Sequence, residues 1–166
     1  STMSIRNFRR AKCTVVHHHQ TVVLQQEYRK FPAFLQATCN MNPNTVTCAL
    51  QFEEESNIFF RCFIAFPIAQ ELGRLTMNII VADCFHFKTE SCDFVIMNLA
   101  TRTGCGRTIL LAIAIIPSEN VNHICWVLQM CLRHGMELKC AIFTDQGPML
   151  AASAAFYEAF KIKLKL

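Results

Sequence analysis

Two apolar segments that each lead into an aspartate constrain the fold of this chain more than any other feature. The first covers residues 78–82 and ends at Asp83, and the second covers residues 138–144 and ends at Asp145. Short apolar runs rich in β-branched residues predict buried strands. An ionised carboxylate at the end of such a strand is costly unless it is paired, hydrogen-bonded or bound to a metal ion. The pattern therefore predicts two carboxylates that converge on one site.

The composition indicates one domain with an N-terminal extension. The chain has 166 residues, of which 52% are hydrophobic, so it has enough apolar material for a core. No apolar run approaches the ~18 residues that a membrane span requires, and no segment has the pattern of a signal peptide. We therefore expect no membrane partner. We expect residues 1–75 to form the extension, with a basic lead-in, a helix and a hairpin, and residues 76–166 to form the core.

The cysteines favour a reducing compartment. The chain contains ten of them, but no two are spaced as Cys-x-x-Cys. Several lie inside apolar strand or helix patterns, where a free thiol packs as a small hydrophobic group. We expect all ten to be free, and we expect an intracellular location.

The charge of the chain is compatible with nucleic acid as a partner and equally with an ordinary basic protein. The formal net charge is +4, from 16 Lys and Arg against 12 Asp and Glu. The adjacent residues His17, His18 and His19 cannot all face one way on a helix or strand, so a metal site there is not expected.

Before the core, the pattern predicts one helix, one hairpin and one short helix. Apolar spacing predicts a helix from Pro32 to about residue 40, with a break near Phe31 because proline is unsuited to a helix interior. Residues 45–52 and 58–66 read as the two strands of a hairpin. A short helix should follow through Glu71 and end at Gly73.

The core should contain five strands and two helices. Three strands are expected at 78–87, 93–101 and 107–116, with a hairpin turn at residues 104–106. A helix should start at Val121, capped by Asn120 or Ser118, and should end before Gly135. Strand 138–144 and a helix from Pro148 to about residue 160 follow. Lys alternates with Ile or Leu over residues 161–166, which predicts a fifth strand.

Three short motifs in this order resemble the transposase domain of Mutator-like elements, the MULE type. Residues 83–88 are similar to Asp-Gly-Thr-Phe-x-Lys of that family. Residues 112–119 are similar to its Ala-Phe-Ala-aliphatic-Val-x-x-Glu, and Trp126 falls about where the family has a helix Trp. Residues 144–147 resemble its Thr-Asp-Gly/Gln. The resemblance covers about residues 25–160.

The resemblance implies an α/β fold of the ribonuclease H-like type, with a mixed five-stranded sheet in the order 3-2-1-4-5 flanked by helices. Members of that family cut and join DNA with two divalent metal ions, held by two Asp and a Glu. Carried over, Asp83 and Asp145 would be catalytic and metal-binding residues, and Glu119 an accessory candidate. Mg²⁺ or Mn²⁺, weakly bound, would be the cofactor. DNA would be the partner, besides protein partners or a second copy, and the location would be nuclear.

Other interpretations of the same residues stay open. Asp145 could cap the helix that opens at Pro148, and Glu119 could be a favourable charge at a helix N-terminus, on the far side of the second strand. Cys84 replaces the family's glycine, so we expect it to crowd the metal side. The family's third acid would lie beyond the end of this core.

Three function classes follow from these expectations. The first is an active DNA transposase whose remaining residues lie outside this sequence. The second is a domesticated domain that binds DNA or protein without cutting. The third is an interaction domain that has kept only the fold. We expect a degenerate domain that does not cleave DNA.

Overall fold

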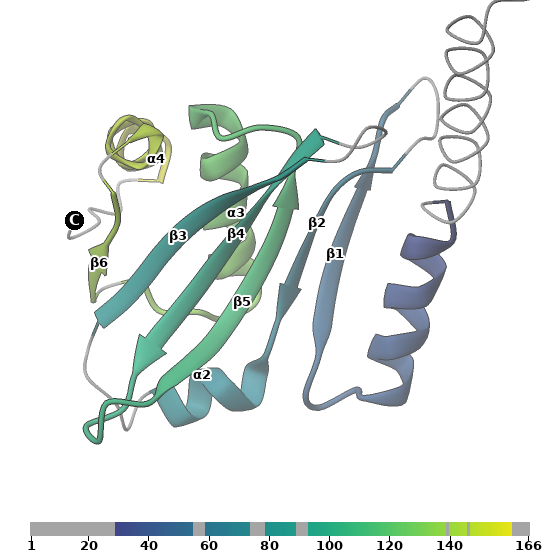
Figure 1. The fold of residues 1–166 in the computed structure, drawn as a ribbon, viewed down its shortest axis with the longest axis horizontal. Coiled ribbons are helices and arrows are strands. Elements are labelled where there is room, and N and C mark those ends of the chain that lie inside the picture. The colour runs from purple at the N-terminus through teal and green to yellow at the C-terminus, as the bar shows by residue number, and fades with distance from the viewer. Residues whose placement is uncertain are drawn as a thin grey trace, which may run out of the picture.

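The computed structural model describes residues 29–54, 59–73, 79–88, 93–138, 140–145 and 147–160, and they form an α/β fold around one mixed sheet (Figure 1). The strands are β1 (Thr47–Phe52), β2 (Phe59–Ala65), β3 (Ile79–Lys88), β4 (Asp93–Arg102), β5 (Thr108–Ile116) and β6 (Ala141–Phe143). The helices are one over residues 29–41, α2 (Pro67–Gly73), α3 (Val121–Arg133) and α4 (Pro148–Phe160). No helix in these ranges is long and apolar enough to cross a membrane.

The sheet has six described strands in the order β1-β2-β5-β4-β3-β6, which differs from the expected order 3-2-1-4-5. The expected strands one to four are β3, β4, β5 and β6, and they lie side by side as β5-β4-β3-β6. The hairpin expected in the N-terminal extension lengthens the sheet, because β2 pairs antiparallel with β5. This pairing satisfies backbone groups that β5 would otherwise expose at a sheet edge. The expected fifth strand, residues 161–166, lies outside the described residues, as do His17–His19.

The pairing directions around β3 agree with the sequence-based prediction. Strand β3 pairs antiparallel with β4 and parallel with β6. Antiparallel neighbours can be joined by a tight turn, whereas a parallel return needs a crossover such as helix α3. The expected turn after β4 is present at β4–β5, where the Gly106 N–H donates to the Thr103 carbonyl at 2.9 Å. Gly106 adopts a φ of 83°, which favours glycine.

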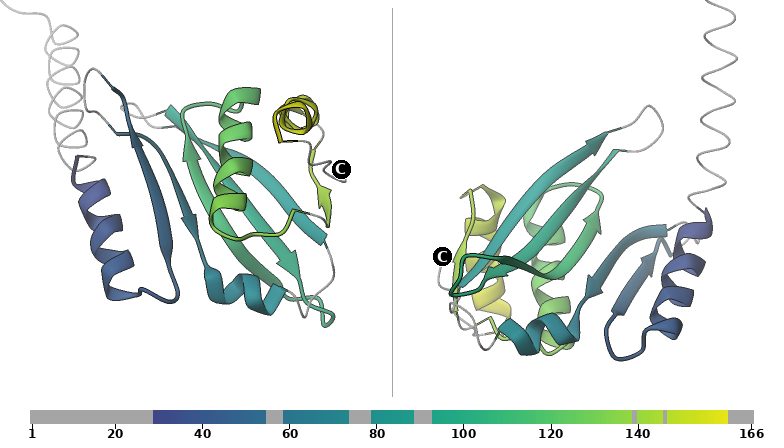
Figure 2. Two further views of the ribbon diagram at one scale, coloured as in Figure 1. Left: turned by 180° about the vertical axis from the view of Figure 1, so that it is seen from behind. Right: turned by 60° about the horizontal axis from the view of Figure 1, so that its bottom comes forward.

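Helices α3 and α4 cover the same face of the sheet (Figure 2). The face of α3 predicted to be apolar is the one it buries, through Ile124, Leu128 and Cys131. Asn120 caps the helix, because its side chain accepts a hydrogen bond from the His123 N–H at 2.9 Å. Gly135 follows the helix with a φ of 77°, as expected for a residue after a helix end.

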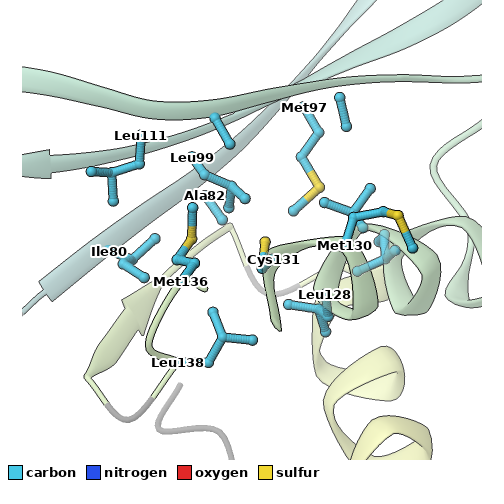
Figure 3. Close-up of a cluster of buried hydrophobic side chains, with 14 of the residues drawn as sticks. Ile80, Ala82, Met97, Leu99, Leu111, Leu128, Met130, Cys131, Met136 and Leu138 are labelled. Atoms are coloured by element: carbon cyan, nitrogen blue, oxygen red, sulfur yellow. The ribbon is translucent and has the colours of Figure 1, made fainter. Parts of the chain in front are cut away.

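The core lies between this face of the sheet and the two helices (Figure 3). Strand β4 contributes Met97 and Leu99, α3 contributes Leu128, and α4 contributes Phe156, all nearly inaccessible to solvent. Burying a large apolar side chain stabilises a fold by about 1.5–3 kcal/mol. This core fixes the position of β3 and β6, which carry the predicted site.

The expected helix break near Phe31 is wrong. Phe31 and Pro32 both lie inside the helix over residues 29–41. Proline removes one backbone donor but has a φ that suits a helix, so a helix can contain it where neighbouring contacts compensate. The Phe31 ring packs edge-on against Phe59 of β2, with 5.6 Å between centroids, and Leu35 is buried.

Candidate functional site

Strand β3 presents Asp83 on the face of the sheet opposite to α3 and α4. Ala82 is buried in the core, while Asp83 and Val81 are exposed. Successive side chains on a strand alternate between faces, so the face of Asp83 is also that of Val81 and Phe85. Across the antiparallel pair, Asp83 faces Asn98 of β4.

The parallel pairing of β3 with β6 ends two residues before Asp83 and Asp145. The last pair of this ladder is Val81 with Phe143. Counting two residues onward on each strand reaches Asp83 and Asp145. The two aspartates predicted to converge are therefore at the same end of two adjacent strands, although β6 ends before Asp145.

Local hydrogen bonds support the alternative role of Asp145 near the start of α4. Its Oδ1 accepts a hydrogen bond from the Gly147 N–H at 3.4 Å and one from the Thr144 hydroxyl at 3.3 Å. Gly147 immediately precedes Pro148, the first residue of α4. A carboxylate at this position satisfies a backbone donor and interacts favourably with the helix dipole. This role uses one carboxylate oxygen and is compatible with cation binding through the other.

Glu119 is closer to Asp145 than expected. The expectation that it would lie apart, beyond the second strand, is wrong for its side chain. A Cβ built on Gly147 would lie 3.6 Å from Glu119 Oε1 and 3.8 Å from Asp145 Oδ1. Glu119 Oε2 also lies 3.9 Å from His86 Nε2, and the Glu119 side chain is 20% exposed. The segment after β5 therefore returns Glu119 toward the end of β3.

Cys84 lies close to all three carboxylates but does not occupy the face of Asp83. Its side chain packs against the core, next along β3 from Asp83. Burial, followed by the negative charges of Glu119, Asp145 and Asp83 in that order, raises the pKa of the Cys84 thiol to about 12. The expectation that Cys84 crowds the metal side is wrong, because strand alternation turns it toward the helices.

The carboxylates do not form a ready three-ligand site. Within the described ranges, no three His, Cys, Asp or Glu side chains are grouped so that they could hold a metal ion. A two-carboxylate arrangement can still suit Mg²⁺, which usually retains several water ligands.

Sequence reasoning missed a second polar cluster, between β2 and α3. Arg61 of β2 contacts His123 and Trp126 of α3 and Gln51 of β1. Arg61 lies in an apolar strand pattern, and the sequence offers no local signal that pairs it with residues more than sixty positions away.

Comparison with known proteins adds no relative. No family model, no curated protein and no solved structure matches this chain. The resemblance to Mutator-like transposases therefore depends on the sequence motifs alone.

Proposed function

We propose that this chain is a domain derived from a Mutator-like transposase, with a ribonuclease H-like core made of β3 to β6, α3 and α4. The observation that carries the proposal is the parallel register of β3 and β6, whose last pair, Val81 with Phe143, lies two residues before the aspartate of each motif. The ancestral role of these aspartates is to hold Mg²⁺ or Mn²⁺ for DNA cleavage and strand transfer. The antiparallel order of β3, β4 and β5 and the crossover through α3 also support the proposal.

In this chain, Asp83 and Asp145 hold one divalent cation weakly. Each supplies a hard oxygen ligand of the kind that Mg²⁺ and Mn²⁺ prefer, and water completes the coordination. Such a cation would supply Lewis-acid stabilisation of charge on a phosphate. Asp83 is exposed, so a hydrated ion can reach it without displacing core side chains.

The proposed domain does not cleave DNA. A two-metal mechanism needs carboxylates on one side of the reacting phosphate, so that both ions contact it. Here Asp83 lies on the face of the sheet opposite to the helices, whereas the Glu119 carboxylate lies beside His86 and near Gly147. Among the described residues, no three His, Cys, Asp or Glu side chains are grouped to hold a metal ion, so a second ion has no ligand set there.

A plasmid-nicking assay tests this part of the proposal. Supercoiled plasmid is incubated with the wild-type chain and with Asp83→Asn and Asp145→Asn variants, in Mn²⁺ and in Mg²⁺. We expect equal, background nicking by all three proteins. Wild-type cleavage that both substitutions abolish would contradict the proposal and would show that a third ligand completes the site.

A non-catalytic binding domain is the second candidate function. The face of the sheet opposite to α3 and α4 favours it. Val81, Phe85 and Phe143 expose 38%, 43% and 58% of their surface there. Exposed apolar groups that lie together often mark interaction sites. The nicking reactions are also run on a native gel. Plasmid that migrates more slowly but is not cleaved would favour this candidate and would indicate DNA as the partner. The retardation should weaken steeply with salt.

A further inference from the structure

Arg61 joins three elements of the fold. From β2, its Nε donates a hydrogen bond to Gln51 Oε1 of β1 at 2.8 Å. Its Nη1 lies 3.0 Å from Nδ1 of His123, in the first turn of α3. Its guanidinium carbon lies 4.3 Å from the centre of the Trp126 ring, which is cation–π distance. We call Arg61, Gln51, His123 and Trp126 the Arg61 cluster.

The contact between Arg61 and His123 requires a neutral imidazole. Arginine can only donate hydrogen bonds, so His123 Nδ1 must accept. A protonated imidazole would present an N–H and a positive charge to the guanidinium. A positive charge is also unfavourable in the first turn of a helix. Burial and the charge of Arg61 both lower the pKa of His123 from its ordinary value of 6.5.

The surroundings of His123 offer no counter-charge in the part of the chain that the structure describes. From β2, it faces Arg61 and the Phe60 ring, at 5.5 Å between centroids. From its own helix, its backbone N–H donates to the uncharged side chain of Asn120. The nearby carboxylate of Glu119 lies toward His86 and Gly147. Arg61 is the charge that acts on the imidazole.

The other end of α3 provides a matched comparison. His134, the C-cap residue, has its Nδ1 3.0 Å from the Thr47 hydroxyl of β1, and its ring lies 5.4 Å from that of Phe63. Burial lowers the pKa of His134 as well. A hydroxyl can donate or accept, so Thr47 can keep this hydrogen bond when His134 is protonated. Arg61 cannot do the same for His123.

We propose that protonation of His123 breaks its contact with Arg61 and loosens the β1–β2 hairpin from α3, so that the Arg61 cluster is a pH-sensitive joint. The pairing of β2 with β5 remains, and the packing of the hairpin against the helix changes. The contact is complete well above pH 6.5, where His123 is neutral in folded and unfolded chains alike. Because the folded pKa is lowered, the stability from this contact is lost as pH falls below 6.5.

The test is an NMR pH titration of the full ¹⁵N-labelled chain from pH 8 to pH 4.5. It follows the Arg61 Nη1–H signal and the ring signals of His123 and His134. The variants are His123→Gln, whose amide oxygen can accept from Arg61 but does not titrate, and His134→Gln as the control. Amide exchange of β2 measures how far the hairpin loosens.

In the wild type and in His134→Gln, we expect the Arg61 Nη1–H signal to be lost with the midpoint of the His123 ring titration. In His123→Gln it should persist at pH 5. Protection of β2 amides should fall by up to about tenfold per pH unit below 6.5 only where His123 is present. A signal that survives protonation of His123, or that is lost equally in His123→Gln, would overturn the proposal. If His123→Gln does not fold, the wild-type titration decides. Equal midpoints for the Arg61 signal and the His123 ring support the proposal, and different midpoints refute it.

Discussion

Among single residues, Cys105 has the environment of the most reactive thiol that the structure describes. The eight described cysteines lie outside disulfide bonds, and Cys105, in the β4–β5 turn, is the one of them that is exposed. Its Sγ lies 3.1 Å from the Thr103 hydroxyl. This contact and the Arg107 backbone lower the pKa of Cys105, whereas burial raises the pKa of Cys62 to about 12. Cys13 and Cys92 lie outside the described residues.

We predict that brief alkylation of the folded protein modifies Cys105 first among these eight, because the thiolate is the nucleophile and must be accessible. The measurement is peptide mass spectrometry after a short exposure to iodoacetamide at pH 7.5. Thr103→Val should slow the modification of Cys105 by removing the hydroxyl. Earlier modification of Cys62 or Cys131 would show that the core opens under these conditions.

Residue-level reasoning could have placed Cys84 correctly. The period of two along β3 assigns Asp83 and Cys84 to opposite faces, and this period is readable from the buried and polar residues around them. The position of Glu119 was not readable in this way. It depends on the path of residues 117–120 between β5 and α3, and local sequence does not specify how far a side chain in such a connection returns toward another strand.

At the scale of single elements, α4 packs against α3 through a few buried residues on one side of the helix. Phe156 is fully buried, and Met149 and Ala152 lie on the same side. The Cys125 thiol of α3 also lies 3.4 Å from the Ala152 carbonyl. Leu150, on the same helix, is 61% exposed. The position of α4 matters to the site because Asp145 and Gly147 lead into this helix.

We predict that Phe156→Ala lowers the free energy of unfolding by about 3–5 kcal/mol, because it removes a buried ring and leaves a cavity. Leu150→Ala is the matched control and should change this free energy by at most about 0.5 kcal/mol. Urea denaturation followed by circular dichroism measures both. Similar effects of the two substitutions would mean that α4 does not pack in this orientation.

At the scale of the whole molecule, sequence patterns predicted most elements and their pairing around β3. Apolar β-branched runs and the turn at Gly106 predicted β3, β4 and β5, and the length of the α3 crossover predicted the parallel return to β6. The pairing of β2 with β5 could not be predicted. The sequence of a strand indicates that the strand pairs, but it does not indicate which strand is its partner. The Arg61 cluster was missed for the same reason, because His123 and Trp126 of α3 are more than sixty residues from Arg61 in the sequence.

The charge distribution of the whole molecule bears on how it would meet DNA. The net charge of +4 is small for a chain of 166 residues. The carboxylates of Asp83 and Asp145 would repel phosphates unless a cation neutralises them. Cation binding is therefore the step on which a DNA-related role of these residues would depend.

Localised binding of Mn²⁺ is the measurement that tests this account most directly. Mn²⁺ is paramagnetic and broadens the NMR signals of nearby amides, so a titration of the ¹⁵N-labelled chain to millimolar Mn²⁺ locates the ion.

The variants are Asp83→Asn, Asp145→Asn, Glu119→Gln and, as a control, Asp93→Asn, whose carboxylate forms a surface pair with Lys88 at 3.3 Å. We predict broadening centred on Asp83 and the Asp145–Gly147 segment in the wild type. It should persist in Glu119→Gln and Asp93→Asn, and disappear in Asp83→Asn and in Asp145→Asn. Broadening that is spread over the surface, or that survives both aspartate substitutions, would contradict a cation site at the ends of β3 and β6.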